Sequence, residues 1–116
     1  MATIRFVKGD TATVRFNYEN FIPEEGDKVF LTVKKSCFDK NCALEKSYPG
    51  NGIEWDDETN TFIVTFLPQD TQDLQTHWEY GFDIQYVFNQ TPCVIKTPLT
   101  DGIFILDDEY TTYNGE

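Results

Sequence analysis

The stretch HWEYGFDIQYVFN, residues 77–89, alternates between two classes of residue along its whole length. The residues on one face are Trp78, Tyr80, Phe82, Ile84, Tyr86 and Phe88, and those on the other are Glu79, Gly81, Asp83, Gln85, Val87 and Asn89. A strand face repeats every second residue, whereas a helix face repeats every 3.6 residues. The stretch therefore predicts a long β-strand with its aromatic face, Trp78 included, in a core and its other face in water.

The same alternation recurs through the rest of the chain. Residues 61–67 place Phe62, Val64 and Phe66 on one face, and residues 28–35 and 11–18 follow the same pattern. Shorter strands are predicted at residues 3–8, 43–48, 53–55, 93–97 and 103–106. The last two are expected to be halves of one kinked strand, because the turn-forming string PLTDG separates them.

Turn-forming residues lie between these runs. Gly9 lies between the first two predicted strands, which indicates a bulge or kink. Residues 68–74 are the one place for a helical turn, which we expect Asp70 or Thr71 to cap. The polar tail, residues 109–116, is expected to fray.

Seven to nine short strands in a chain of 116 residues predict an all-β fold in a single domain, residues 1–116. A turn with Asp70, then Leu74, then Tyr80 early in a strand resembles a corner of immunoglobulin-like domains, where a Tyr hydroxyl bonds back to the preceding connection. The cysteine pair of antibody domains is missing. We therefore expect an immunoglobulin-like antiparallel β-sandwich without a disulfide framework.

Net charge limits the classes of partner. Nine Lys and Arg against twenty Asp and Glu give a formal charge of −11. Affinity for nucleic acid and for anionic lipid comes largely from cations, so we expect neither as a partner. The chain also lacks the long apolar run of a membrane span and the N-terminal pattern of a secretion signal.

The three cysteines, Cys37, Cys42 and Cys93, are an odd number. Free thiols in a chain made in a reducing cytosol are the simplest interpretation. Cys37 and Cys42 flank a predicted hairpin loop and would face each other, so they could pair under oxidation. Together with Cys93 and His77 they would supply the four ligands of a zinc site. Zinc sites usually show two closely spaced ligand pairs, however, and this sequence has at most one loosely spaced pair. We expect no metal.

Four strings carry a resemblance to a known family. They are KGDT at residues 8–11, VFLTVKKS at 29–36, LPQDTQDL at 67–74 leading into YGFDI at 80–84, and DGIFIL at 101–106. In this order they resemble small β-sandwich domains of tailed bacteriophages and prophages, in particular the N-terminal domain of baseplate upper proteins. The resemblance covers roughly residues 3–110. One departure is that His77, Trp78 and Glu79 precede Tyr80, where a Gly is usual in the family.

The resemblance implies a structural or adaptor role in a virion, in a protein made in the cytoplasm of the bacterial host. It implies other tail or baseplate proteins as partners, allows a homo-oligomer, and supplies no catalytic residues. The family domain often heads a longer chain. Functions of that following region, such as host recognition, are not carried over to this sequence.

Enzymatic function lacks the required residues. The chain has one His, His77, and two serines, Ser36 and Ser47, and none of them lies in a catalytic motif. A hydrolase with a carboxylate pair is therefore the least favoured function. Glu54, Asp56, Asp57 and Glu58 could contribute to a calcium site, but the loop spacing is absent and an acidic hairpin that keeps the domain soluble is favoured. We expect no catalytic or cofactor residue.

Exposed aromatic residues offer two interpretations. A carbohydrate-binding module is the alternative function, in which a flat sugar-binding surface would be formed by Trp55, Trp78, Tyr86 and Phe88. The last three share a strand face with Tyr80, Phe82 and Ile84, which favours a place in the core instead. Other aromatics lie in loops, in short strands or opposite a core face, and we predict a protein interface there: Phe21, Phe30, Phe38, Tyr48 and Trp55. Residues 3–8 and 103–106 are the expected open edges, through which a ring of copies could close.

Overall fold

The alternating runs form eight strands and one short 3₁₀ turn, in a computed structural model that describes residues 2–17, 21–36, 40–89 and 94–108. The elements are β1 (Thr3–Val7), β2 (Ala12–Phe16), β3 (Lys28–Lys34), β4 (Leu44–Tyr48), β5 (Ile53–Asp56), β6 (Thr61–Phe66), η1 (Pro68–Asp70), β7 (Tyr80–Phe88) and β8 (Val94–Asp107). The all-β prediction is confirmed. None of the described segments is a helix with the length and apolar character needed to cross a bilayer.

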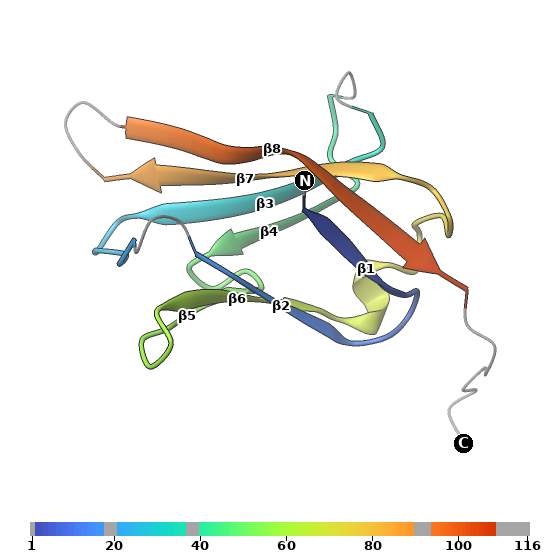
Figure 1. The fold of residues 1–116 in the computed structure, drawn as a ribbon, viewed down its shortest axis with the longest axis horizontal. Coiled ribbons are helices and arrows are strands. Elements are labelled where there is room, and N and C mark those ends of the chain that lie inside the picture. The colour runs from blue at the N-terminus through green and yellow to red at the C-terminus, as the bar shows by residue number, and fades with distance from the viewer. Residues whose placement is uncertain (1, 18–20, 37–39, 90–93, 109–116) are drawn as a thin grey trace.

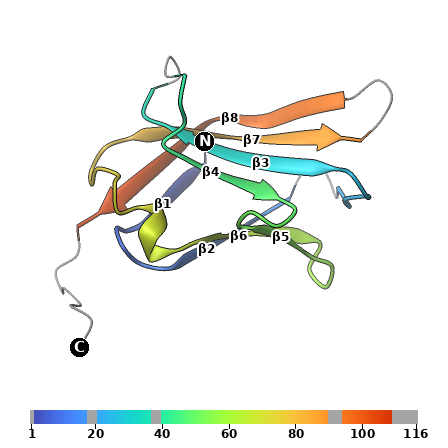
Figure 2. The same cartoon turned by 180° about the vertical axis from the view of Figure 1, so that it is seen from behind.

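The strands form two sheets that face each other (Figure 1). One sheet has the order β1-β8-β7-β3-β4 and the other β2-β6-β5. β1 and β8 run parallel, and all the other described pairs run antiparallel. The view from behind (Figure 2) shows the same two layers, with η1 at the end of β6 where the chain returns to the larger sheet.

The core fills the space between the sheets. Every second residue of β3, β6 and β7 is buried, as the alternation predicts. Phe62 lies at the centre of an aromatic cluster, with ring centroids between 4.8 and 6.0 Å from those of Phe16, Phe21, Tyr48, Trp55 and Tyr86. Most of these rings meet edge to face, a geometry that aromatic pairs favour.

β7 begins at Tyr80, three residues later than predicted. His77 has a positive φ of 60°, and its backbone N–H donates to the Leu106 carbonyl at 2.8 Å, so the chain turns there. Trp78 consequently leaves the predicted core face. It is 42% exposed, and the Lys35 ammonium lies 4.6 Å from its ring centroid. The prediction that Trp78 belongs to the core is therefore wrong.

The connection before β7 contains the helical turn, and both predicted capping residues lie at its end, Asp70 as its last residue and Thr71 as its C-cap. η1 starts at Pro68, so Asp70 is its third residue, and its carboxylate accepts the Leu67 N–H at 2.7 Å. Thr71 is fully buried, and its Oγ1 accepts the Gly9 N–H at 3.0 Å. Thr71 thus links this connection to the β1–β2 turn. Gly9 lies in that turn and adopts a φ of 89°.

The hydrogen bond expected of Tyr80 is present. Its Oη accepts the backbone N–H of Gln75 at 2.9 Å, while its ring is buried near Phe104. The start of β7 is therefore fixed to the connection that leads into it.

One of the two predicted open edges is correct. β1 is an outer strand, but residues 103–106 lie between β1 and β7, so the prediction that they form an edge is wrong. β8 is continuous from Val94 to Asp107 and joins the two predicted half-strands, with register shifts along its pairing to β7. Because β1 pairs only with residues 103–107, the first half of β8 has no neighbour on its other side among the described strands.

Candidate interaction surface

Three of the five predicted interface aromatics turn toward the core. The ring centroids of Phe21, Tyr48 and Trp55 lie 6.0, 5.3 and 4.8 Å from that of Phe62. All three side chains are half-buried, so they close the rim of the core. Phe38 lies outside the described residues.

Phe30 is the fifth, and it lies on the outer face of the five-stranded sheet. β3 buries Val29, Leu31 and Val33, so its alternate residues point away from the core. Each of these outward residues has a cross-strand partner on β7; the pairs are Lys28–Val87, Phe30–Gln85, Thr32–Asp83 and Lys34–Gly81. Partners of this kind have Cβ atoms roughly 5 Å apart and form one continuous surface.

Three apolar residues lie near one end of this outer face, beside the exposed Lys28, which pairs with Val87. Val87 of β7 pairs with Ile95 of β8, and Phe30 lies diagonally across from Val87. Ile95 is 56% exposed, whereas Phe30 and Val87 are half-buried. We call Phe30, Val87 and Ile95 the outer apolar patch. It adjoins the half of β8 that β1 leaves uncovered.

The middle of the outer face is hollowed. A depression of about 320 Å³ is lined by Phe30, Thr32, Lys34, Glu45, Asp83 and Gln85. A second hollow of about 150 Å³ shares Thr32, Lys34 and Asp83 and continues to Gly81 and Thr100. A Cβ added at Gly81 would meet nothing within 4 Å, so the missing side chain leaves the floor open. We call the two hollows together the sheet groove.

The sheet groove contains charges of both signs. Burial raises the pKa of the Asp83 carboxyl above its ordinary value, and attraction to Lys34 offsets part of that rise. Glu45 enters from β4, where its Oε2 accepts a hydrogen bond from Thr32 Oγ1 at 3.3 Å. A partly buried carboxylate in a hollow is a recognised signal of a functional site, although ion-pair networks also produce such shifts.

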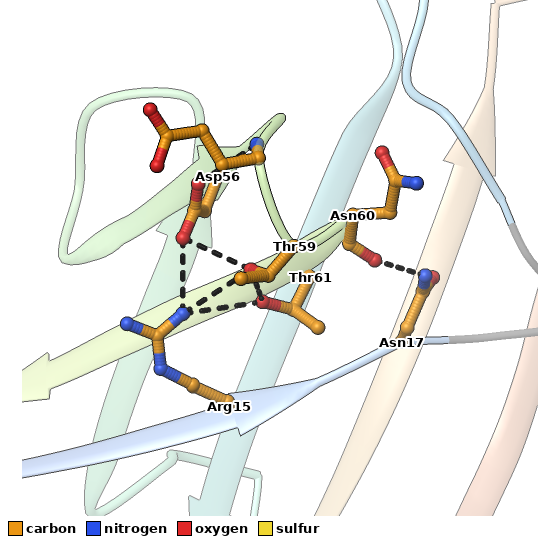
Figure 3. A network of polar contacts seen from close by, with 7 residues as sticks. Arg15, Asn17, Asp56, Thr59, Asn60 and Thr61 are labelled. Carbon is orange, nitrogen blue, oxygen red and sulfur yellow. Dashed lines mark hydrogen bonds and ion pairs between the residues drawn. The ribbon is translucent and has the colours of Figure 1, made fainter.

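The acidic hairpin, for which a calcium site is the less favoured interpretation, forms hydrogen bonds within its own turn and to β2. Asp56 accepts hydrogen bonds from Arg15 Nη1 at 3.1 Å and from Thr59 Oγ1 at 2.9 Å (Figure 3). These bonds, the Arg15 bond first, lower the pKa of the Asp56 carboxyl. Asn17 beside them donates to the carbonyl of Asn60. In the part of the chain that the structure describes, no three His, Cys, Asp or Glu side chains are grouped as metal ligands.

The remaining candidate residues lie on the surface or outside the described ranges. His77 is exposed, and its Nε2 lies 2.8 Å from Asp108 Oδ2, which lowers the pKa of that carboxyl. Cys42 is an exposed free thiol. Cys37 and Cys93 fall outside the described residues, and so does any pairing of Cys37 with Cys42.

Sequence reasoning did not identify the sheet groove. Its signal lay in the stretch 77–89, where the polar face carries Gly81, Asp83 and Gln85 in succession. A glycine on the outward face of an otherwise bulky strand marks a place where another molecule can approach the backbone. No protein-family model matches the chain, and no curated protein matches it either.

Proposed function

We propose that this chain is a non-enzymatic structural or adaptor protein of a bacteriophage or prophage virion, associated with the tail or baseplate, that acts through protein contacts. The observation that carries the proposal is the outer apolar patch. Ile95 exposes more than half of its side chain beside Phe30 and Val87, on a protein with a charge of −11. Apolar residues gathered on one face of an acidic surface favour a protein partner over nucleic acid.

The placement of the four family-like strings supports the resemblance. The string at residues 8–11 contacts the one at 67–74 through the Gly9–Thr71 hydrogen bond. The string at 80–84 is joined to the string at 101–106 by cross-strand pairing of β7 with β8. The string at 29–36 contains most of β3, which pairs with the string at 80–84. The residues that carry the resemblance thus contact one another in the folded chain, which supports a shared fold.

We further propose that the sandwich is immunoglobulin-like. A five-stranded sheet containing the first and last strands, packed on a sheet of three, is a strand distribution compatible with that fold. The Tyr80 bond to Gln75 matches the corner at which such domains fix the strand after a sheet-crossing connection. Domains of this architecture serve many functions, so the fold alone favours no partner.

Two surfaces fit an assembly role. The outer apolar patch suits a face-to-face contact, and β1 is an open edge at the other side of the same sheet. A specific interface buries about 800 Å² on each partner, so the patch would be the centre of a larger contact. A head-to-tail arrangement of copies would close into a ring.

Particle composition tests the proposal directly. Prophages of the source bacterium would be induced, and sedimented particles analysed by mass spectrometry for peptides of this chain. Peptides at a constant ratio to tail proteins are expected. Particles rich in tail proteins but lacking this chain would remove the virion role.

A pair of matched variants then tests the patch. We expect Ile95→Lys to reduce incorporation into particles, because a charge at the centre of an apolar contact loses its hydration on burial. Leu67→Lys is the control, since Leu67 is also exposed but precedes η1, away from the start of β8 (Figure 1). Equal incorporation of both variants would mean that the patch is not the contact.

A further inference from the structure

We infer that the sheet groove is a binding site for a short, electrically neutral saccharide, a function that goes beyond the assembly role although the two surfaces share Phe30. The groove crosses β4, β3, β7 and β8, and adjacent strands lie about 4.8 Å apart, so it extends for roughly 14 Å. That length suits an oligosaccharide better than a single side chain of a partner protein. The larger hollow, about 320 Å³, is at the lower end of the range for small-molecule sites.

The charges of the groove disfavour anions. Thr32 pairs with both Glu45 and Asp83 across the strands, and Lys34, the next residue of β3 on the same face, pairs with Gly81 and lies diagonally from the two carboxylates. An anion would be repelled by two carboxylates, whereas the Lys34 ammonium offsets only part of their attraction for a cation. A neutral polar ligand is repelled by none of these groups and can donate hydrogen bonds to the carboxylates, and a cationic probe is therefore the necessary comparison.

The hydrogen-bonding groups of the groove match hydroxyl groups. Burial weakens the hydration of Asp83, and among the described residues none donates a hydrogen bond to its carboxylate. Gln85, Thr32 and Thr100 can each donate and accept, as a saccharide hydroxyl does. Because burial has removed part of the water around Asp83, a hydrogen bond from a ligand hydroxyl would compensate for that lost hydration. Hydrogen bonds to a charged acceptor are also stronger than those between neutral groups.

Apolar surface is present where a sugar ring needs it. Phe30 lines one end of the larger hollow and is half-buried there. At the other end Gly81 leaves the floor open, and its φ lies outside the left-handed region. A larger residue at position 81 therefore fits the strand backbone and fills the hollow, which provides a steric test that spares the fold.

The experiment is a titration of the ¹⁵N-labelled protein followed by NMR chemical shifts. The probes are neutral di- and trisaccharides of glucose, galactose, rhamnose and N-acetylglucosamine, and N-acetyl-arginine amide as the cationic comparison. We expect at least one saccharide to shift the amide signals of Thr32, Gly81 and Asp83, with a dissociation constant of about 1 mM, as suits a shallow site. Gly81→Val and Asp83→Ala should each weaken binding at least tenfold.

A matched control separates blocking of the groove from general damage. Thr13→Val changes an outward residue on β2 in the other sheet, and binding should be unchanged. The spectra of all variants also report whether each is folded. Absence of groove shifts with every saccharide at about 50 mM would overturn the inference, since a 1 mM site would then be nearly saturated. Shifts with the arginine amide alone, or saccharide binding that survives Gly81→Val, would overturn it too.

Discussion

The ion pair between Lys46 and Asp70 should be a principal contributor to stability. Lys46 Nζ lies 2.6 Å from Asp70 Oδ2, and their side chains are only 9% and 18% exposed. Asp70 also accepts the Leu67 N–H, and the Lys46 stem passes so close to Gly52 that a Cβ there would lie 2.5 Å from its Cδ. The pair joins β4 of one sheet to the connection after β6 of the other. We predict that Lys46→Met, which keeps the apolar stem and removes the charge, destabilises the fold.

The expected loss follows from the burial of the pair. Removing one partner of a buried ion pair costs about 3–5 kcal/mol, because the other charge is left without compensation. Asp70 retains some solvent and the Leu67 N–H, so we expect about 3 kcal/mol, the lower end of that range. For a domain of this size that corresponds to a fall of roughly 10–15 °C in the unfolding midpoint. Arg5→Met, which breaks the exposed Arg5–Asp107 pair, should leave the midpoint almost unchanged.

Urea unfolding followed by circular dichroism would measure these changes, and a double-mutant cycle would assign them. Asp70→Asn alone leaves the Lys46 ammonium without its counter-charge. In the combined Lys46→Met and Asp70→Asn variant neither charge is orphaned, so the loss should be smaller than the sum of the two single losses. Losses that simply add, or a Lys46→Met variant as stable as the parent chain, would refute the reasoning.

Three further outcomes are expected. Tyr80→Phe should cost about 1 kcal/mol in urea unfolding, because the Gln75 N–H loses its acceptor; an unchanged stability would show that water replaces the bond. Phe62→Ala should cost about 3–5 kcal/mol in the same assay, whereas Leu67→Ala at an exposed site should cost far less. Desolvation is the largest single effect on the pKa of Asp70 and raises it, but the hydrogen bonds from Lys46 and Leu67 and the charge of Lys46 together outweigh it, so the folded pKa is lowered. Its stabilisation should therefore be complete above about pH 4–5 and be lost as the pH falls through the folded value, and Asp70→Asn should flatten that dependence.

Much of the fold could be predicted because a period of two is a local signal. The buried residues of β3, β6 and β7 are those that parity predicts, and the two sheets follow from many short strands with few places for a helix. The Tyr80 hydrogen bond was also predictable, since it joins residues only five positions apart. Such features depend on neighbours in the chain, which the sequence contains in full.

Features that depend on distant contacts could not be predicted in the same way. By its position in the alternating pattern Trp78 belongs to the buried face. The hydrogen bond from the His77 N–H to the carbonyl of Leu106, on another strand, makes the chain turn there, so the strand begins only after Trp78. Parity is undefined for Phe21, which lies between strands, so its contact with Phe62 was not foreseen. The sheet groove requires knowing that β4, β3, β7 and β8 are adjacent in that order, which no single stretch reveals.

Besides β4, which is the outer strand at one side, the larger sheet has two open edges at the other side, the uncovered half of β8 and β1, and these two differ in their suitability for assembly. The uncovered half of β8 carries Lys96 and Pro98, and both residues disfavour addition of another strand, the first by its charge and the second by its missing N–H. β1 contains no Pro, and its one charged residue, Arg5, is paired with Asp107. In its parallel pairing with β8, every second residue of β1 directs its backbone N–H and C=O groups toward β8, as the hydrogen bond from the Ile103 N–H to the Ala2 carbonyl shows. The backbone groups of the intervening Thr3 and Arg5 therefore point to the open side. Strand addition is therefore expected at β1, whereas contact near β8 would use its face, where Ile95 is exposed.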